Sequence, residues 1–155
     1  AYDYVNRLME QNRKNSALLS AKPTETNAAA ERMAEELAGV KYRVSQLENE
    51  LFSLKAKAYA GESNVLLFES AMSPDAVRRF ADAILAGCTG RIAIFAGDDE
   101  QGYKYALCQK DGDLRQTVKA LNAACNGRGG GKPFFAQGSV QASRAQLEAF
   151  FASLG

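Results

Sequence analysis

The sequence predicts a small α/β domain, a mixed β-sheet with flanking helices, preceded by a long antiparallel helical hairpin arm. Residues 1–60 repeat apolar side chains at spacings of three and four, as amphipathic helices do. Residues 61–155 alternate short apolar runs with amphipathic stretches in the order β-α-β-β-α-β-α. Between them, Gly61-Glu62-Ser63 is typical of a break in regular structure. We therefore predict an arm at 1–60 and a globular domain at 61–155.

The arm is predicted to contain two helices of unequal length. The first begins at Tyr2 and ends near Leu19, and the second begins near Pro23, a residue suited to a first helical turn. The second helix carries a coiled-coil seam of about four heptads, formed by Ala30, Met33, Leu37, Val40, Val44, Leu47, Leu51, Leu54 and Ala58. The shorter helix can cover this seam only to about residue 43. The rest of the seam packs against a second chain, which predicts a homodimer, or alternatively folds back on the chain's own domain.

The globular part is predicted to contain four strands and three helices. Apolar runs predict strands at 65–68, 92–95, 103–108 and 134–137. Ser73-Pro74 is typical of a helix start, and Ser143 with Gln146 forms a capping-box pattern before the last helix. The aromatic residues on the predicted strands could stack on nucleobases, but such residues more often form the core of a small sheet: Tyr103, Tyr105, Phe134 and Phe135.

The composition argues against several classes of protein. The chain has no His and so lacks the usual general base and the commonest transition-metal ligand. Its three cysteines, Cys88, Cys108 and Cys125, are far apart, which predicts reduced, buried thiols in a cytoplasmic protein. The acidic cluster 98–100 is typical of a solvated turn, with a hard-cation site as the alternative. We predict a chain with no catalytic site, no cofactor of its own and no membrane span.

The most unusual stretch is the glycine-rich run from Asn126 to Gly138, NGRGGGKPFFAQG. Glycines let backbone N–H groups converge on an anion, and Arg128 and Lys132 add positive charge. The run does not fit a P-loop, because Pro133 follows Lys132 where Ser or Thr is needed, and it does not open a helix as a dinucleotide fingerprint does. A backbone nest for phosphate remains, with a passive glycine-rich connection as the alternative.

The charge distribution favours an anion site at this run. The net charge is only +1, but residues 114–155 contain five cations and a single acid, Glu148. The residues predicted to contact phosphate are Arg128, Gly129, Gly130, Gly131 and Lys132, with an outer ring of Arg115, Lys119 and Arg144.

The run from Asn122 to Gly138 resembles the signature of the DHHA1 domain, which ends alanyl-tRNA synthetases and the long stand-alone alanyl-tRNA editing proteins. The segment Leu19 to Glu25 is similar to the helix-opening segment of those editing proteins. The resemblance implies a module that contacts the outer corner of tRNA(Ala) and dimerises through its helical part. It also implies a parent protein that hydrolyses mischarged Ser- or Gly-tRNA(Ala) at a zinc centre in an upstream domain. The start at Ala1, without Met and inside a predicted helix, agrees with a fragment of such a protein.

Two departures from the family pattern bear on the choice among its members. Lys132-Pro133 and the compact Ala136-Gln137-Gly138 replace the Arg-Pro and longer segment of many synthetases, which favours the stand-alone editing protein. The related DHH phosphoesterases usually carry His after the glycines, where this chain has Lys132. The alternative is therefore a nucleotide- or oligonucleotide-binding DHHA1 domain of such a phosphoesterase.

Overall fold

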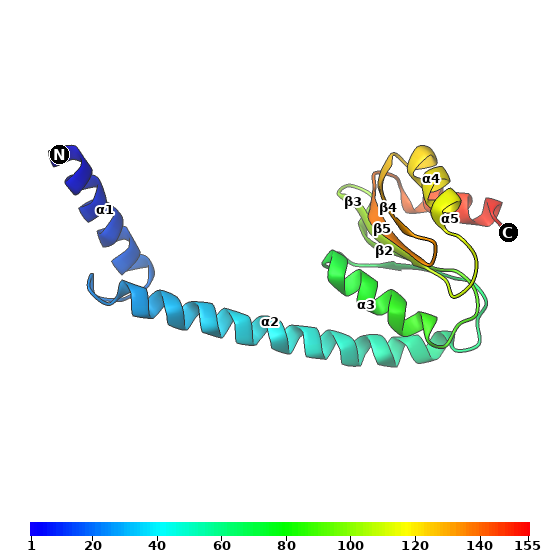
Figure 1. Ribbon diagram of the computed structural model, residues 1–155, viewed down its shortest axis with the longest axis horizontal. Helices are drawn as coiled ribbons and strands as arrows, with labels where there is room; N and C mark the ends of the chain where they lie inside the picture. Colours follow the sequence, from blue (N-terminus) through cyan, green and yellow to red (C-terminus); the bar gives the residue numbers. More distant parts are fainter. The chain divides into compact units, whose positions relative to one another are not determined.

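The computed structural model describes residues 1–155, and it contains five α-helices and one five-stranded sheet (Figure 1). The chain divides into two compact units, Ala1–Gln46 and Leu47–Gly155. The second unit holds the sheet and also the last turns of the long helix, which the sequence pattern assigns to the arm. None of the helices has the length and apolarity needed to cross a lipid bilayer.

The N-terminal helices are α1 (Tyr2–Leu18) and α2 (Thr26–Ala56), followed by the short 3-10 helix η1 (Lys57–Tyr59). The predicted long helix is thus confirmed, but the antiparallel packing of the two helices is not seen, since α1 buries no residue. The seam of α2 is likewise exposed, with Leu37 and Val40 at 54% and 60%. The helical stripe of α1 that should cover it is interrupted by Asn12 and Asn15, so it offers too little apolar surface to hold a helix pair.

The sheet has the strand order β1-β2-β3-β5-β4. Strands β1 (Val65–Glu69) and β2 (Ile92–Asp98) are parallel, and helix α3 (Pro74–Leu85) forms the crossover that parallel strands require. All other neighbours are antiparallel, and they involve β3 (Gly102–Cys108), β4 (Gly127–Lys132) and β5 (Phe135–Val140). This mixed sheet with flanking helices confirms the predicted fold class.

Helices cover both faces of the sheet (Figure 1). Helix α3 and the end of α2 pack on one face, where Phe52 stacks on Phe80 with ring centroids 4.7 Å apart. Helices α4 (Arg115–Ala124) and α5 (Arg144–Ser153) pack on the other face. The alternation along β2 supplies both cores, since Ile92 and Ile94 belong to the first cluster whereas Phe95 belongs to the second.

Local signals explain the helix starts. The Ser73 side chain accepts a hydrogen bond from the Ala76 N–H at 3.1 Å, and Pro74 opens α3. At α5, Ser143 and Gln146 form the predicted capping box. The acidic cluster forms the β2–β3 turn, where an Asp98 carboxylate oxygen accepts hydrogen bonds from the N–H groups of Glu100 and Gln101 at 2.9 and 2.7 Å. Each of these features is decided by residues close in sequence.

The glycine-rich run is not a loop, which corrects the prediction of a backbone nest. Residues Gly127–Lys132 form strand β4, so the order of elements is β-α-β-β-α-β-β-α. None of the glycines in β4 has a positive φ, and only Asn126 before them does, at 47°. A nest needs successive N–H groups turned to one side by alternating right- and left-handed residues, which an extended strand does not provide. The predicted fourth strand is displaced accordingly and runs from Phe135 to Val140.

Candidate nucleic-acid interface

Strand β4 lies at the edge of the sheet and pairs only with β5. A short turn, Pro133-Phe134, joins the two strands, so that Lys132 pairs with Phe135. The carbonyl of Pro133 accepts a hydrogen bond from the Leu114 N–H at 2.8 Å, and that of Phe134 accepts one from the Gln109 N–H at 3.1 Å. The β4–β5 hairpin is therefore fixed at its tip by the segment that connects β3 to α4.

The first groove beside β4, the α4 groove, lies between this strand and helix α4, with a volume of about 290 Å³. The Asn122 side chain spans its floor, because its amide donates to the Gly129 carbonyl at 3.1 Å and accepts from the Tyr105 hydroxyl at 3.1 Å. The groove is lined mainly by predicted site residues: Arg115, Lys119, Gly129, Gly130, Gly131 and Lys132. Sequence reasoning thus identified most of this groove.

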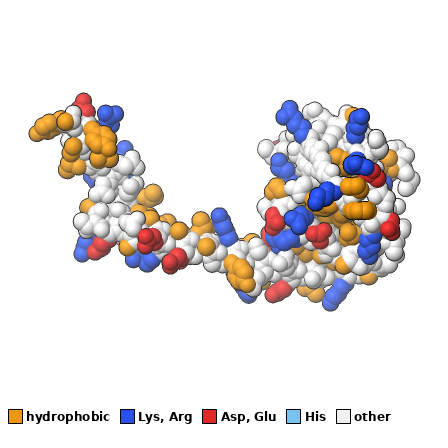
Figure 2. Space-filling view, in the orientation of Figure 1, with side chains coloured by type: hydrophobic (Ala, Val, Ile, Leu, Met, Phe, Trp, Pro, Cys, Tyr) orange, Lys and Arg blue, Asp and Glu red, His pale blue; other side chains and the backbone are white.

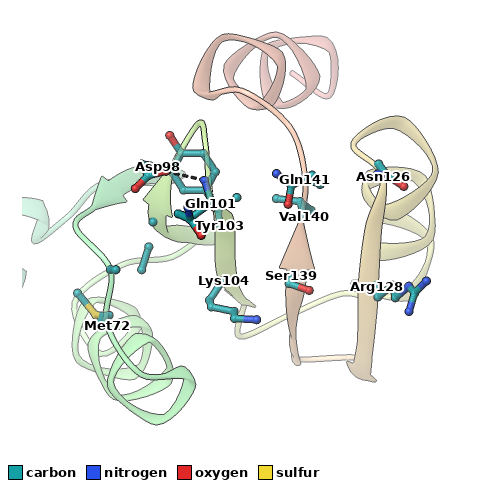
Figure 3. A pocket seen from close by; sticks show the side chains of 14 residues that line it. Met72, Asp98, Gln101, Tyr103, Lys104, Asn126, Arg128, Ser139, Val140 and Gln141 are labelled. Atoms are coloured by element: carbon teal, nitrogen blue, oxygen red, sulfur yellow. Dashed lines mark hydrogen bonds between the residues drawn. The ribbon is translucent and has the colours of Figure 1, made fainter.

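The second surface is the opposite face of the β4–β5 hairpin, where the register aligns Lys104, Ser139 and Arg128 across β3, β5 and β4. We call it the open sheet face, and it comprises Lys104, Arg128, Gly130, Lys132, Gln137 and Ser139. Part of it lines a cavity of about 580 Å³ (Figure 3). Figure 3 shows the Lys104 ammonium directed toward Ser139, with Arg128 projecting from the outer strand. Lys104 and Ser139 are additions to the predicted site.

The alternation of β3 contains a signal for Lys104. Tyr103 and Tyr105 point into the core below α4 and α5, so Lys104 between them must point to the other face. Its position beside Arg128 depends on the β3–β5–β4 pairing, which cannot be read from the sequence of β3 alone.

The cations around β4 differ in whether they have a partner. Lys104, Lys119, Arg128 and Lys132 form no ion pair. Arg115 instead pairs with Asp113 at 2.6 Å, and its hydrogen bonds lower the pKa of that carboxyl to about 2. The four unpaired cations are therefore the ones whose charge is available to an anion. Figure 2 shows more Lys and Arg than acidic side chains on the visible face of the second unit.

The structure does not place Arg144 with the other predicted residues. Arg144 begins α5, pairs with Glu148 at 2.8 Å and lies over the Phe68 ring at 4.6 Å. It lines neither the α4 groove nor the cavity at the open sheet face. The outer ring as predicted is thus reduced to Arg115 and Lys119.

The glycines of β4 differ in what surrounds them. A Cβ at Gly129 would meet the Tyr105 hydroxyl and lie 2.5 Å from the Gln137 carbonyl oxygen, and one at Gly131 would lie 2.6 Å from the Ala136 Cα. Close packing of the hairpin therefore requires glycine at both positions. At Gly130 a Cβ would meet nothing within 4 Å, and the backbone is not left-handed. Packing does not explain why glycine occupies position 130. Because Gly130 has no side chain, the backbone between Arg128 and Lys132 is left uncovered.

The chemical groups at this edge are suited to binding an anion. Ammonium, guanidinium, hydroxyl and amide groups donate hydrogen bonds, and the chain has no His to act as a general base. No three Cys, Asp or Glu side chains are grouped closely enough to hold a metal ion. The thiols are also poor ligands, since burial raises the pKa of all three cysteines.

Comparisons with known proteins agree with this architecture. No curated protein sequence matches the chain. Among solved structures, the C-Ala domain of alanyl-tRNA synthetase from Aquifex aeolicus matches with a TM-score of 0.50 and 14% identity, covering 61% of this chain and 90% of that one. RecJ in complex with Mn²⁺ from Thermus thermophilus matches with a TM-score of 0.59 and 18% identity, covering 91% of this chain and 22% of that one. At these identities the likeness shows the fold alone.

The chain therefore spans only about a fifth of the length of that RecJ, whereas it spans most of the C-Ala domain. The family model of the DHHA1 domain matches residues 61–154, which include the sheet, the β4–β5 hairpin and helices α3 to α5. The resemblance read from the glycine-rich motif is thereby confirmed, and the chain belongs to the DHHA1 domain family.

Proposed function

We propose that this chain is a nucleic-acid-binding module that holds phosphates of the backbone along strand β4. One observation carries the proposal: the four unpaired cations Lys104, Lys119, Arg128 and Lys132 flank an edge strand left bare at Gly130. Arg128 and Lys132 are about 13 Å apart along the strand, which spans more than one phosphate of a nucleic-acid chain. Such contacts supply affinity and orientation rather than base recognition.

Within this class we propose tRNA(Ala) as the partner. The likeness to the C-Ala domain and the glycine-rich signature support this choice. The module presents the tRNA to a separate, zinc-dependent editing domain that hydrolyses mischarged Ser- or Gly-tRNA(Ala), and it contributes no catalytic residue or cofactor of its own. The exposed seam of α2 pairs with a second copy of the chain, and the assembly works in the cytoplasm.

Replacing two cations of the edge strand tests this proposal. Arg128→Ala combined with Lys132→Ala should weaken the binding of a tRNA(Ala) transcript by the full chain. The slope of log affinity against log salt should also become shallower by roughly 1 to 2, because fewer counterions are displaced. Fluorescence anisotropy titrations at two salt concentrations measure both effects.

A charge-matched control is Arg144→Ala combined with Lys57→Ala. Both residues are exposed, and neither lines a groove beside β4. This variant should bind like the unmodified chain. Equal losses in the two double variants, or no loss in the first, would contradict the assigned interface.

The second candidate is the oligonucleotide-binding part of a DHH phosphoesterase. The observation that favours it is the extent of the RecJ matches, which cover 84% to 91% of the chain and so extend beyond the DHHA1 domain into the N-terminal helices. This candidate predicts saturable binding of a mono- or dinucleotide in the cavity beside Lys104 and Arg128, with tRNA bound no better than any other polyanion. Competition of tRNA(Ala) against a dinucleotide and against heparin separates the two functions.

A further inference from the structure

Phe134 is an apolar side chain that the core of the globular domain does not use. Within residues 61–155 it is one of only two large hydrophobic residues that are exposed, at 55%, and the other, Leu154, is at the chain end. The aromatic residues on the neighbouring strands face inward: Tyr103 and Tyr105 are buried, and Phe135 packs against the cluster below α3. The two adjacent phenylalanines thus point to different environments.

The backbone that carries Phe134 is held in place. It occupies the two-residue turn of the β4–β5 hairpin, after Pro133, whose ring restricts the backbone. The carbonyls of both turn residues accept hydrogen bonds from Leu114 and Gln109, as described above. An aromatic ring presented on a fixed turn loses little conformational entropy when a flat partner covers it.

The surroundings of this ring match a nucleotide. Lys132, two residues before Phe134, has no ion-pair partner and lies where the α4 groove meets the hairpin tip. Aromatic faces that bind single-stranded nucleic acids are combined with cations in this way, because the ring stacks on a base while the cation holds a phosphate. A base inside a duplex is stacked on its neighbours and does not present its face.

We propose that Phe134 stacks on an unpaired nucleobase, so that the module recognises a looped or single-stranded segment next to the phosphates held along β4. This inference rests on the proposed function and deepens it, since it names the feature of the nucleic acid that is recognised. The unpaired base can come from a tRNA loop or from a single-stranded DNA or RNA, and the chemistry of stacking is the same for each.

The test uses the full chain and an oligothymidylate of about 12 nucleotides, a length within the range that single-strand-binding folds cover. Phe134→Ala should weaken binding about tenfold, since one stacked base contributes this much in related surfaces. Phe134→Leu keeps an apolar side chain but removes the ring, and it should lose nearly as much. A duplex of the same length should bind the unmodified chain and both variants equally.

A direct readout is available because the chain contains no Trp. In Phe134→Trp the single indole reports on its own contact, and its fluorescence should be quenched when the oligothymidylate or a tRNA(Ala) transcript binds. An oligonucleotide with abasic sites at every position keeps the phosphates and should not quench it. Comparing the tRNA with the oligothymidylate shows whether a tRNA loop is the better source of the base.

The outcomes separate this inference from the proposed function. Unchanged binding by Phe134→Ala and Phe134→Leu, together with an unquenched indole in Phe134→Trp, would overturn stacking while leaving the phosphate contacts intact. If Arg128→Ala combined with Lys132→Ala binds as well as the unmodified chain, the proposed function is contradicted. The inference, which rests on that function, is then contradicted too. Circular dichroism confirms that each variant is folded.

Discussion

At the scale of single residues, Gly129 and Gly130 differ in role: Gly129 packs inside the hairpin, whereas Gly130 lies on its surface. The space beside Gly129 is filled by Tyr105 and by the backbone of β5, whereas the space beside Gly130 is empty. Neighbouring glycines in one strand therefore have different reasons to be glycine. A pair of substitutions can tell these reasons apart.

Gly130→Val should leave the free energy of unfolding nearly unchanged, because a Cβ at this position meets no atom within 4 Å and Val, with its added methyl groups, favours a strand. It should weaken tRNA binding by roughly tenfold, or about 1.4 kcal/mol, because those groups cover the backbone between Arg128 and Lys132. Urea denaturation and anisotropy titrations measure the two effects. Gly129→Val is the matched comparison, and it should be destabilised by about 1–3 kcal/mol through overpacking. Full affinity in the Gly130 variant would show that no ligand approaches this strand closely.

Buried titratable groups predict how stability depends on pH. Burial raises the pKa of the Cys108 thiol to about 12, and burial together with the hydrogen bond to Asp99 raises the pKa of Tyr103 to about 12. Both folded pKa values lie above those of the unfolded chain, about 8.5 for Cys and 10 for Tyr. The protonated forms therefore stabilise the fold fully below about pH 8.5, and this contribution is lost as the pH rises toward about 12.

These two groups should leave the urea midpoint of unfolding unchanged from about pH 7 to 8 and lower it above about pH 9. Cys108→Ala should be less stable near neutral pH because it leaves a cavity. Its midpoint should fall less steeply between about pH 9 and 10, because one of the buried thiols that resist ionisation is gone. Parallel curves for the variant and the unmodified chain would show that Cys108 titrates normally in the fold.

At the scale of elements, the parts that the sequence predicts well are those defined by neighbouring residues. Helix α3 follows from Ser73-Pro74 and from apolar residues spaced on one face, and α5 follows from its capping box. The parallel β1–β2 pair joined by α3 follows from the order of the elements. For these elements, local preference and tertiary packing agree.

Strand β4 could not be predicted in the same way. A run of glycines has no side-chain alternation, and its pattern is typical of a loop. What makes it a strand is the pairing with β5 across the hairpin and the close approach of Tyr105 from β3, and no side-chain pattern within the run signals either contact. The predicted site residues survive this change because Arg128 and Lys132 are both in β4, on one face of the hairpin. Arg144 does not lie with them, because it starts α5 over Phe68 of β1, the edge strand opposite β4.

Helix α2 is also divided by its contacts rather than by its sequence pattern. Its periodicity continues without a break, but its last turns belong to the sheet-bearing unit. There Arg79 of α3 binds Glu48 at 2.6 Å, and Lys55 binds Glu69 of β1 at 2.8 Å. These ion pairs lie on the side of α2 that carries Phe52. The apolar seam lies about 100° around the helix from that side and stays exposed.

At the scale of the whole molecule, this exposed seam is a long row of apolar side chains that the core does not use. It continues from Met33 through Leu37, Val40 and Val44 to Leu54, with each of these side chains 48% to 63% exposed. Contiguous apolar surface of this kind commonly marks an interface. The heptad spacing suits another helix of the same type, and we therefore propose the dimer to be a coiled coil of two α2 helices.

Two charges placed in this seam should dissociate the dimer. Val40→Glu combined with Val44→Glu buries carboxylates against apolar side chains, so the dissociation constant should rise at least about tenfold. Sedimentation velocity measures the change, and the circular dichroism of the sheet-bearing unit should be unaffected. The control is Tyr42→Glu combined with Gln46→Glu, which adds the same charge at positions outside the seam and should remain dimeric. If both variants sediment as the unmodified chain does, the seam of α2 is not the dimer interface. If the seam variant becomes monomeric and also loses tRNA affinity, the two copies bind one nucleic acid together, because linked sites share their binding free energy.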